Sequence, residues 1–234
     1  MEVDDIIKRV RVILDHNDEV DAVVEDDNTL KLDEIIREHI EEGARMVLMQ
    51  CAGELVPWKE IAKDTLLAHK ELKYEGKNVY VLPQDMVRFG SVLLKNWKVP
   101  VTETAAPGSA EHLAQLSEFA GIRASNTRPV AVMVPSMHYT SDGTYPNFDD
   151  CMMLECYGEC GTGAEVAGNS LVSLIVAAAP KIQEDGTIQI GARLEEATLN
   201  MIAALSAETL KDTEKLNTLR GVALQMMGAQ QEQQ

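Results

Sequence analysis

Apolar positions recur every three or four residues in several parts of the chain, and this spacing predicts amphipathic helices. We expect helices over these ranges: 4–15, 33–55, 61–72, 193–210 and 216–227. Asp4 or Asp5 is a suitable N-cap for the first of them. The helix over 33–55 is the clearest, because its apolar residues form a single stripe: Ile35, Ile36, Ile40, Ala44, Val47, Leu48, Cys51 and Leu55. The helix over 193–210 is expected to bury Leu194, Ala197, Met201, Ala204 and Leu205, with Leu210 as a further candidate.

Between these helices, apolar runs bounded by proline and glycine predict β-strands. The segment 79–103 is expected to form two strands joined by a tight turn at Pro83, with Trp97 on the second strand. Pro83 cannot donate a ladder hydrogen bond, so it marks an edge or a corner, and Asp85 can close the turn. Ser109 is expected to cap a short helix that reaches Phe119. Further strands are expected over 129–135, 152–157 and 171–179.

This order of elements predicts an α+β fold, a helical bundle of long amphipathic helices with an inserted small β-rich region. The N-terminal helical part is expected over 1–78, and the β-rich insertion over 79–190. The C-terminal helices and tail are expected over 191–234 and should pack with the N-terminal helices as one domain.

The charge of the chain limits the kinds of partner it can have. Its 234 residues include 38 acidic and 21 basic ones, for a net charge of -17. Phosphate binding needs clustered Lys and Arg, so direct wrapping of nucleic acid is not expected. An acidic surface would instead let DNA slide past without sticking. The acidic start of the chain predicts no signal peptide, and no apolar run is long enough to span a membrane.

The acidic residues between 15 and 29 could mark a calcium site, because hard cations take oxygen ligands. However, this segment lacks the ligand spacing and the central glycine of a calcium-binding loop. A solvated loop is therefore the interpretation we favour.

A group of cysteines is the main candidate for metal chemistry. Cys151, Cys156 and Cys160 are spaced C-x4-C-x3-C, and His138 could supply a fourth ligand for zinc. Cys151 and Cys156 would face opposite sides of a strand, since side chains alternate there. Without a secretory signal, reduced thiols are the favoured interpretation. We therefore expect no metal and no cofactor, with the zinc site kept as an alternative.

Two further motifs have ordinary explanations, so we expect no enzyme. The glycine-rich segment 158–168 is not followed by the G-K-[ST] of a phosphate-binding loop, and a turn between strands accounts for it. Ser136, His138 and Asp142 share one loop, whereas catalytic Ser-His-Asp groups are assembled from separate elements.

Candidate contact residues lie at Trp97 and near the C-terminus. Tryptophan is enriched where protein subunits meet, although packing within the core is the simpler role for Trp97. Met226 and Met227 have adaptable side chains and precede a glutamine-rich end that includes Gln230. We expect these three residues to belong to a partner surface.

Four short motifs together resemble the head–tail connector, or adaptor, proteins of tailed bacteriophages, in particular the ring proteins of crAss-like phages. They are Leu82-Pro83-x-Asp85-x-x-Arg88; Trp97-Lys98-x-Pro100-Val101-Thr102-Glu103; Pro129-Val130-Ala131; and Glu196-Ala197 with Leu205-x-Ala207-Glu208-Thr209-Leu210. The resemblance extends from Asp33 to Met227. It implies a ring, commonly of twelve identical copies, that lies beneath the portal protein and joins the head to further connector or tail proteins. It also implies that the C-terminal segment docks on the portal. Arg88, in the first of these motifs, is a further candidate interface residue.

The resemblance makes a structural virion protein the first hypothesis, with DNA passing through the ring without specific binding. Such a protein would be assembled in the cytoplasm of the bacterial host and located in the virion. The alternative is a cytosolic zinc protein or enzyme that uses the cysteine group. A third possibility is a small regulatory adaptor that binds one partner helix.

Overall fold

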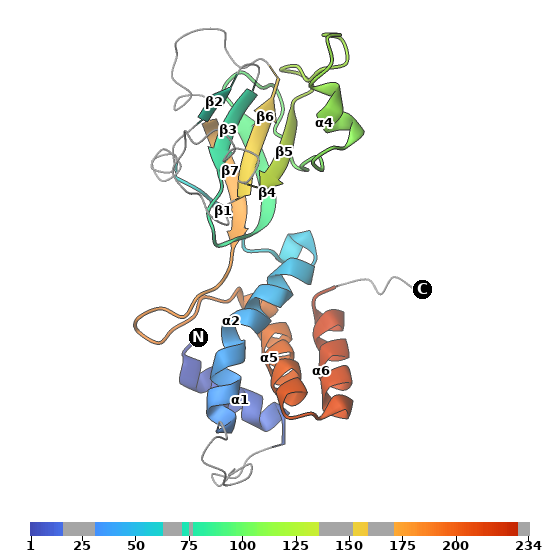
Figure 1. The fold of residues 1–234 in the computed structure, drawn as a ribbon. Coiled ribbons are helices and arrows are strands. Elements are labelled where there is room, and N and C mark those ends of the chain that lie inside the picture. Colours follow the sequence, from blue (N-terminus) through green and yellow to red (C-terminus); the bar gives the residue numbers. More distant parts are fainter. Residues whose placement is uncertain (16–30, 63–71, 75–76, 136–151, 159–170, 229–234) are drawn as a thin grey trace, which may run out of the picture. The chain divides into compact units, whose positions relative to one another are not determined.

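The computed structural model describes residues 1–15, 31–62, 72–74, 77–135, 152–158 and 171–228. The chain divides into two compact units (Figure 1). The helical unit contains residues 1–57 and 179–234, and the β unit contains residues 58–178. The boundaries between the units thus fall after Pro57 and Ala178, whereas the sequence pattern predicted boundaries after residues 78 and 190.

The helical unit contains four α-helices and two single-turn 3-10 helices among its described residues. The α-helices are α1 (Val3–Ile13), α2 (Leu32–Gln50), α5 (Glu195–Thr209) and α6 (Thr213–Met226). The 3-10 helices are η1 (Gly53–Leu55) and η4 (Ala192–Leu194). The stripe predicted for α2 is buried as far as Cys51, but the helix ends at Gln50 rather than residue 55. The N-cap of α1 is Glu2, so Asp4 and Asp5 lie in the first turn. Their negative charges interact favourably with the helix dipole there and stabilise the helix.

Helix α5 is the central element of this unit and packs against α1, α2 and α6. Leu194, Ala197, Met201 and Ala204 are buried as predicted, Leu205 is half-buried, and every residue from Ala197 to Ala204 is buried, so the helix is covered on nearly all sides. Its small residues allow close approach. A Cβ added at Gly43 of α2 would lie 2.7 Å from Ile202 Cγ1 of α5. Only glycine at position 43 therefore allows the two helices to approach this closely.

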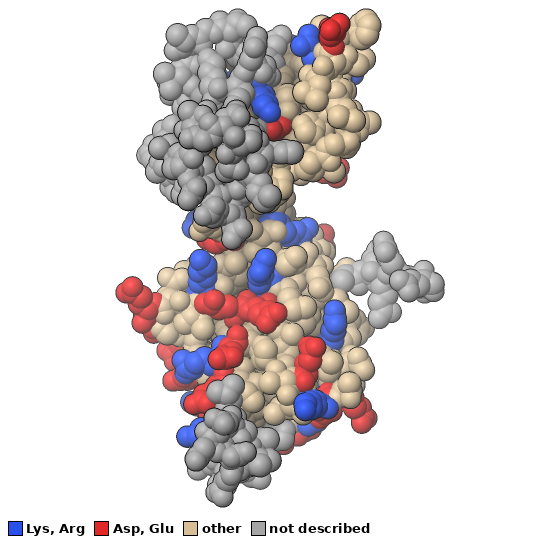
Figure 2. Space-filling view, in the orientation of Figure 1, with Lys and Arg blue, Asp and Glu red and all other residues tan. Residues whose placement is uncertain are grey.

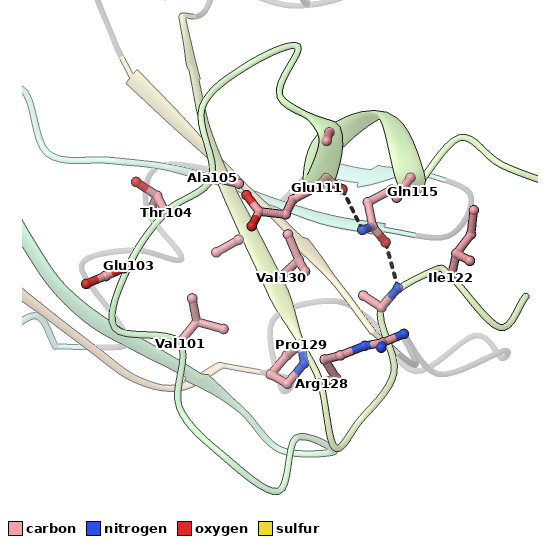
Figure 3. A pocket seen from close by; sticks show the side chains of 14 residues that line it. Val101, Glu103, Thr104, Ala105, Glu111, Gln115, Ile122, Arg128, Pro129 and Val130 are labelled. Atoms are coloured by element: carbon pink, nitrogen blue, oxygen red, sulfur yellow. Dashed lines mark hydrogen bonds between the residues drawn. The ribbon is translucent and has the colours of Figure 1, made fainter.

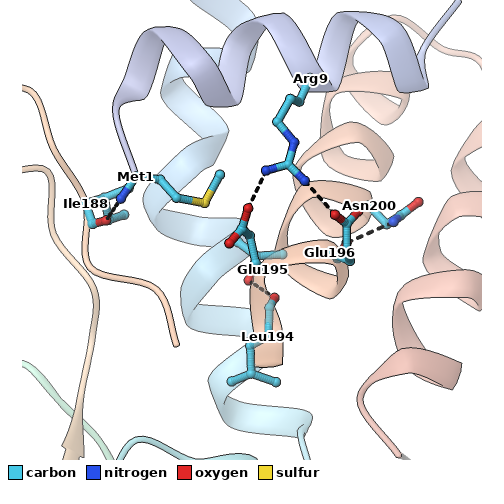
Figure 4. A network of polar contacts seen from close by, with 8 residues as sticks. Met1, Arg9, Ile188, Leu194, Glu195, Glu196 and Asn200 are labelled. Carbon is cyan, nitrogen blue, oxygen red and sulfur yellow. Dashed lines mark hydrogen bonds and ion pairs between the residues drawn. The ribbon is translucent and has the colours of Figure 1, made fainter. Parts of the chain in front are cut away.

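Polar contacts fix α1 against the start of α5 (Figure 4). The Arg9 guanidinium donates to the carboxylates of both Glu195 and Glu196. Glu195 is the main reason that the pKa of Arg9 is raised above its ordinary value. The Met1 ammonium also donates to the Ile188 carbonyl at 2.8 Å, so the start of the chain is held at two places.

The β unit is formed by two antiparallel sheets. One has the strand order β1-β7-β4 and the other β2-β3-β6-β5. The strands are β1 (Lys59–Glu60), β2 (Leu72–Tyr74), β3 (Lys77–Val81), β4 (Met86–Leu94), β5 (Val130–Pro135), β6 (Met152–Tyr157) and β7 (Leu171–Ala178). The predicted strands at 129–135, 152–157 and 171–179 are confirmed to within one residue.

The two sheets pack face to face over a shared apolar core. The four-stranded sheet contributes Tyr80, Leu154 and Cys156 among others, and the three-stranded sheet contributes Val92 and Leu174. The predicted turn at Pro83 is the corner where the chain leaves β3 in one sheet and enters β4 in the other, with the Met86 amide donating to the Pro83 carbonyl at 3.1 Å.

The predicted bundle of long helices with a small β-rich insertion is wrong. The chain is α+β, but its longest described helix has 19 residues, and the two packed sheets form a unit of their own. The reason is that the strands bury apolar residues on both faces, so they make a core that is separate from the helical one.

Three local expectations also need correction. The helix expected over 61–72 is wrong at both described ends, because 61–62 are not helical and β2 begins at Leu72. Helix α4 (Ala110–Ala114) begins after Ser109 as expected but stops short of Phe119. Trp97 lies in a connection rather than on a strand, because the chain turns after Leu94 and returns to pair Val101 with Val92.

Candidate interface on the four-stranded sheet

The outer face of the four-stranded sheet carries a buried carboxylate. Side chains alternate along a strand, and the pairing register places Lys77, Val79, Glu155 and Val132 on the same face. That face is mostly apolar, with Val79, Val81, Val132, Val134 and Met153 buried together. Glu155, only 3% exposed, lies among them. A buried charge is costly unless it is paired and hydrogen-bonded, so its partners matter.

Lys77, Tyr157 and His112, among the described residues, contact the Glu155 carboxylate on this face. The Lys77 ammonium lies 2.7 Å from Oε1, the Tyr157 hydroxyl donates to Oε2, and His112 Nε2 lies 3.4 Å from Oε2. The Gly108 amide donates to His112 Nδ1 at 3.0 Å, so the neutral ring carries its proton on Nε2, facing Glu155. These contacts pair the carboxylate and join α4 to strand β6.

Helix α4 belongs to an excursion of the chain, residues 105–128, that its own hydrogen bonds hold in shape. The Ser109 hydroxyl caps α4 by accepting from the His112 amide. The Gln115 amide group donates to the Glu111 carbonyl at 2.8 Å, and its oxygen accepts from the Ala124 amide at 2.7 Å. At the other end, the Arg128 guanidinium donates to the Gly121 carbonyl at 3.1 Å. The excursion is therefore ordered by specific contacts rather than by burial of its own apolar residues.

Four large apolar side chains of this excursion face solvent, and we call them the apolar ridge: Leu113, Leu116, Phe119 and Ile122. Their exposures are 56%, 72%, 76% and 54%. Two successive turns carry them, since the Leu116 amide donates to the Leu113 carbonyl and the Ile122 amide to that of Phe119. Extensive exposed apolar surface on a soluble protein marks interaction sites.

A groove of about 550 Å³ lies beside the ridge (Figure 3). Its walls come from the segment 101–105, helix α4 and residues 122–131. Val101, Ala105, Ile122 and Val130 give it apolar surface, and Glu103, Glu111, Gln115 and Arg128 give it polar surface. Ile122 belongs to both the ridge and the groove, so the two features adjoin.

The charges around the ridge and groove are nearly balanced. Residues 103–128 contain three carboxylates, from Glu103, Glu111 and Glu118, and two guanidinium groups, from Arg123 and Arg128. This contrasts with the net charge of -17 for the whole chain. Figure 2 shows mostly uncharged surface over the α4 region, with charged side chains at its margins. The region is thus one where another acidic protein could approach without strong repulsion.

The predicted contact residues are dispersed over the structure. Trp97 is 5% exposed, and its Nε1 donates to the Gly158 carbonyl at 2.9 Å within the β unit. Arg88 lies on β4 with its guanidinium 5.8 Å from the centre of the Trp58 ring. Met227 is buried in the helical unit, and Met226 is about half exposed.

Several of the predicted site residues lie outside the part of the chain that the structure describes. They are Gln230, Cys151, Cys160, His138, Ser136, Asp142 and the acidic segment 16–29. Cys156 is fully buried between the two sheets. Within the described residues no group of three or more His, Cys, Asp or Glu side chains could hold a metal ion, and no helix there is long and apolar enough to cross a bilayer.

Neither the ridge nor the buried carboxylate was predicted from the sequence. The ridge left a signal, since Leu113, Leu116, Phe119 and Ile122 follow one another at intervals of three. The first three fall within the short helix expected to reach Phe119, and the structure leaves their side chains exposed. The carboxylate left no such signal, because two of its partners, Lys77 and His112, come from distant segments. In comparisons with known proteins, no family model matches the chain, and neither does any curated protein.

Proposed function

We propose that this protein is a structural subunit of a phage head–tail connector, assembled as a ring of identical copies between the portal and the tail. The observation that supports the proposal is the apolar ridge. Its four large apolar side chains face solvent on an ordered segment of a strongly acidic chain. The sequence motifs that resemble connector proteins give the biological setting.

The order of the excursion favours a binding surface. A surface already held in its bound form loses little conformational entropy when a partner covers it. The contacts of Ser109, Gln115 and Arg128 supply that order. The link from His112 to Glu155 ties it to the sheet below.

Charge also suits this role. In a ring, head-to-tail contacts close when each copy is rotated by a fixed angle from the last. The acidic residues would then line a channel that repels DNA phosphates, so that DNA passes without binding. Contacts between copies would fall where charge is balanced, as it is around the ridge.

Assembly with and without the ridge tests the proposal. We expect mass photometry and electron microscopy of the full chain, alone and with a portal complex, to show ring-shaped oligomers. Leu116→Ser with Phe119→Ser should reduce assembly strongly while the protein stays folded. Val12→Ser is the matched control, because Val12 is 61% exposed but lies on α1, away from the excursion in sequence and in the other unit.

The proposal fails if the wild-type chain stays monomeric and binds no portal complex. Bound zinc in the purified protein, lost on Cys156→Ser, would instead favour the metal-protein alternative.

A further inference from the structure

We infer that the groove of one copy receives Phe119 from the apolar ridge of the next copy, so that ridge and groove are the two halves of one subunit contact. This inference rests on the proposed function, because it names the surfaces by which identical copies would meet. It commits to a second copy of this chain as the occupant of the groove.

The groove has the size and the lining for an aromatic side chain. Its volume of about 550 Å³ falls within the range of sites that hold organic ligands. Val101, Ala105 and Val130 supply apolar walls for a ring. Phe119 is the most exposed large apolar residue of the described chain. An aromatic side chain inserted in a pocket is the usual centre of a strong interface.

The polar residues of the two halves are complementary. On the ridge, Glu118 directly precedes Phe119, and Arg123 directly follows Ile122. The groove is lined by the carboxylates of Glu103 and Glu111 and by the guanidinium of Arg128. Arg123 of one copy would therefore face carboxylates of the next, while Glu118 would face Arg128. Such pairs at the rim orient a contact more than they strengthen it.

Complementary surfaces and charge both point to a second copy as the partner. The ridge and the groove lie on the same chain and adjoin at Ile122, so identical copies would present both halves of the contact to one another. A strongly basic partner would be drawn to the acidic surface elsewhere, whereas the balanced charge here suits a like-charged neighbour.

Two half-blocked variants test the inference. Phe119→Asp disables the ridge and leaves the groove intact. Ala110→Trp fills the groove from an exposed position and leaves the ridge intact. We expect each variant alone to be monomeric by sedimentation velocity, with self-association weakened about thirtyfold or more, as for a residue worth at least about 2 kcal/mol. An equimolar mixture should form dimers and nothing larger, because a single intact contact remains.

Circular dichroism and thermal unfolding would establish that both variants fold, and Val12→Ser should assemble as the wild type does. A charge exchange gives a second reading: Arg123→Glu should weaken assembly, and adding Glu103→Arg and Glu111→Arg should restore it.

Three results would overturn the inference. They are a mixture of the half-blocked variants that stays monomeric, a Phe119→Asp variant that assembles like the wild type, and a wild-type chain that is monomeric up to about 1 mM. If rings still form in the second case, the proposed function stands and only this contact is wrong. If the wild-type chain neither self-associates nor binds a portal complex, the proposed function fails as well.

Discussion

His112 Nε2 lies 3.4 Å from Glu155 Oε2, and this contact joins the helix that begins the apolar ridge to the centre of the four-stranded sheet. The imidazole of His112 is held from both sides, because its Nδ1 accepts from the Gly108 amide at 3.0 Å. His112 thus links the start of the excursion to a carboxylate that is otherwise engaged by Lys77 and Tyr157.

Replacing His112 should therefore loosen α4. We expect His112→Ala to lower the free energy of unfolding by about 1 kcal/mol, the net value of a typical hydrogen bond. Amide hydrogen exchange of Leu113, whose N–H donates to the Ser109 carbonyl, should become faster. Glu118→Gln is the control, since Glu118 is exposed on the same excursion. Unchanged exchange at Leu113 would show that the contact does not hold α4.

The close packing of α2 on α5 leads us to expect opposite changes in stability when Gly43 and Gly221 are replaced by alanine. Gly43→Ala should destabilise the helical unit by about 1–3 kcal/mol, because the new Cβ would lie 2.7 Å from Ile202 Cγ1. Gly221→Ala in α6 should stabilise it by about 0.5–1 kcal/mol, since a Cβ there meets nothing within 4 Å and alanine favours helix. Urea unfolding of both variants measures the difference. Equal shifts of the same sign would contradict the packing of α2 on α5.

Trp97 should matter more to the β unit than Trp58. Trp97→Phe leaves the buried Gly158 carbonyl without the indole donor at 2.9 Å, which should cost about 1–3 kcal/mol. Trp58 is 40% exposed, so Trp58→Phe should cost less. Tryptophan emission separates the two, because the Trp58→Phe protein retains only the buried indole and should emit at shorter wavelength. A larger loss of stability for Trp58→Phe would refute this assignment.

The hydrogen bonds of Asp185 predict how its titration affects stability at acidic pH. The Thr187 hydroxyl and amide donate to its carboxylate at 2.7 and 3.0 Å, and they lower its pKa below the ordinary 3.8. Because the folded pKa is below the unfolded one, the contribution to stability is complete above the unfolded value and is lost as pH falls through the folded value. Carbon-detected NMR titration should give a midpoint below 3.8 for Asp185. Thr187→Val should raise that midpoint, and an unchanged value would show that the hydroxyl is not the cause.

Much of the β unit could be predicted from local sequence. The strands β5, β6 and β7 are apolar runs bounded by proline or glycine, and such runs have few alternatives to burial in a sheet. The turn at Pro83 was also predictable, because proline removes a ladder donor wherever it occurs. The apolar stripe of α2 correctly predicted which face of this helix is buried.

Local sequence thus predicts the type and approximate extent of the elements with strong patterns, since hydrophobic period and chain-breaking residues act within a few positions. Tertiary structure alone decided that the strands form two sheets, that α5 is buried on nearly all sides, and that Lys77 meets Glu155 across 78 residues of chain. These outcomes depend on strand register and helix packing, which join distant segments. The exposure of the ridge also depends on the tertiary structure, because an apolar side chain is buried only if another part of the fold covers it.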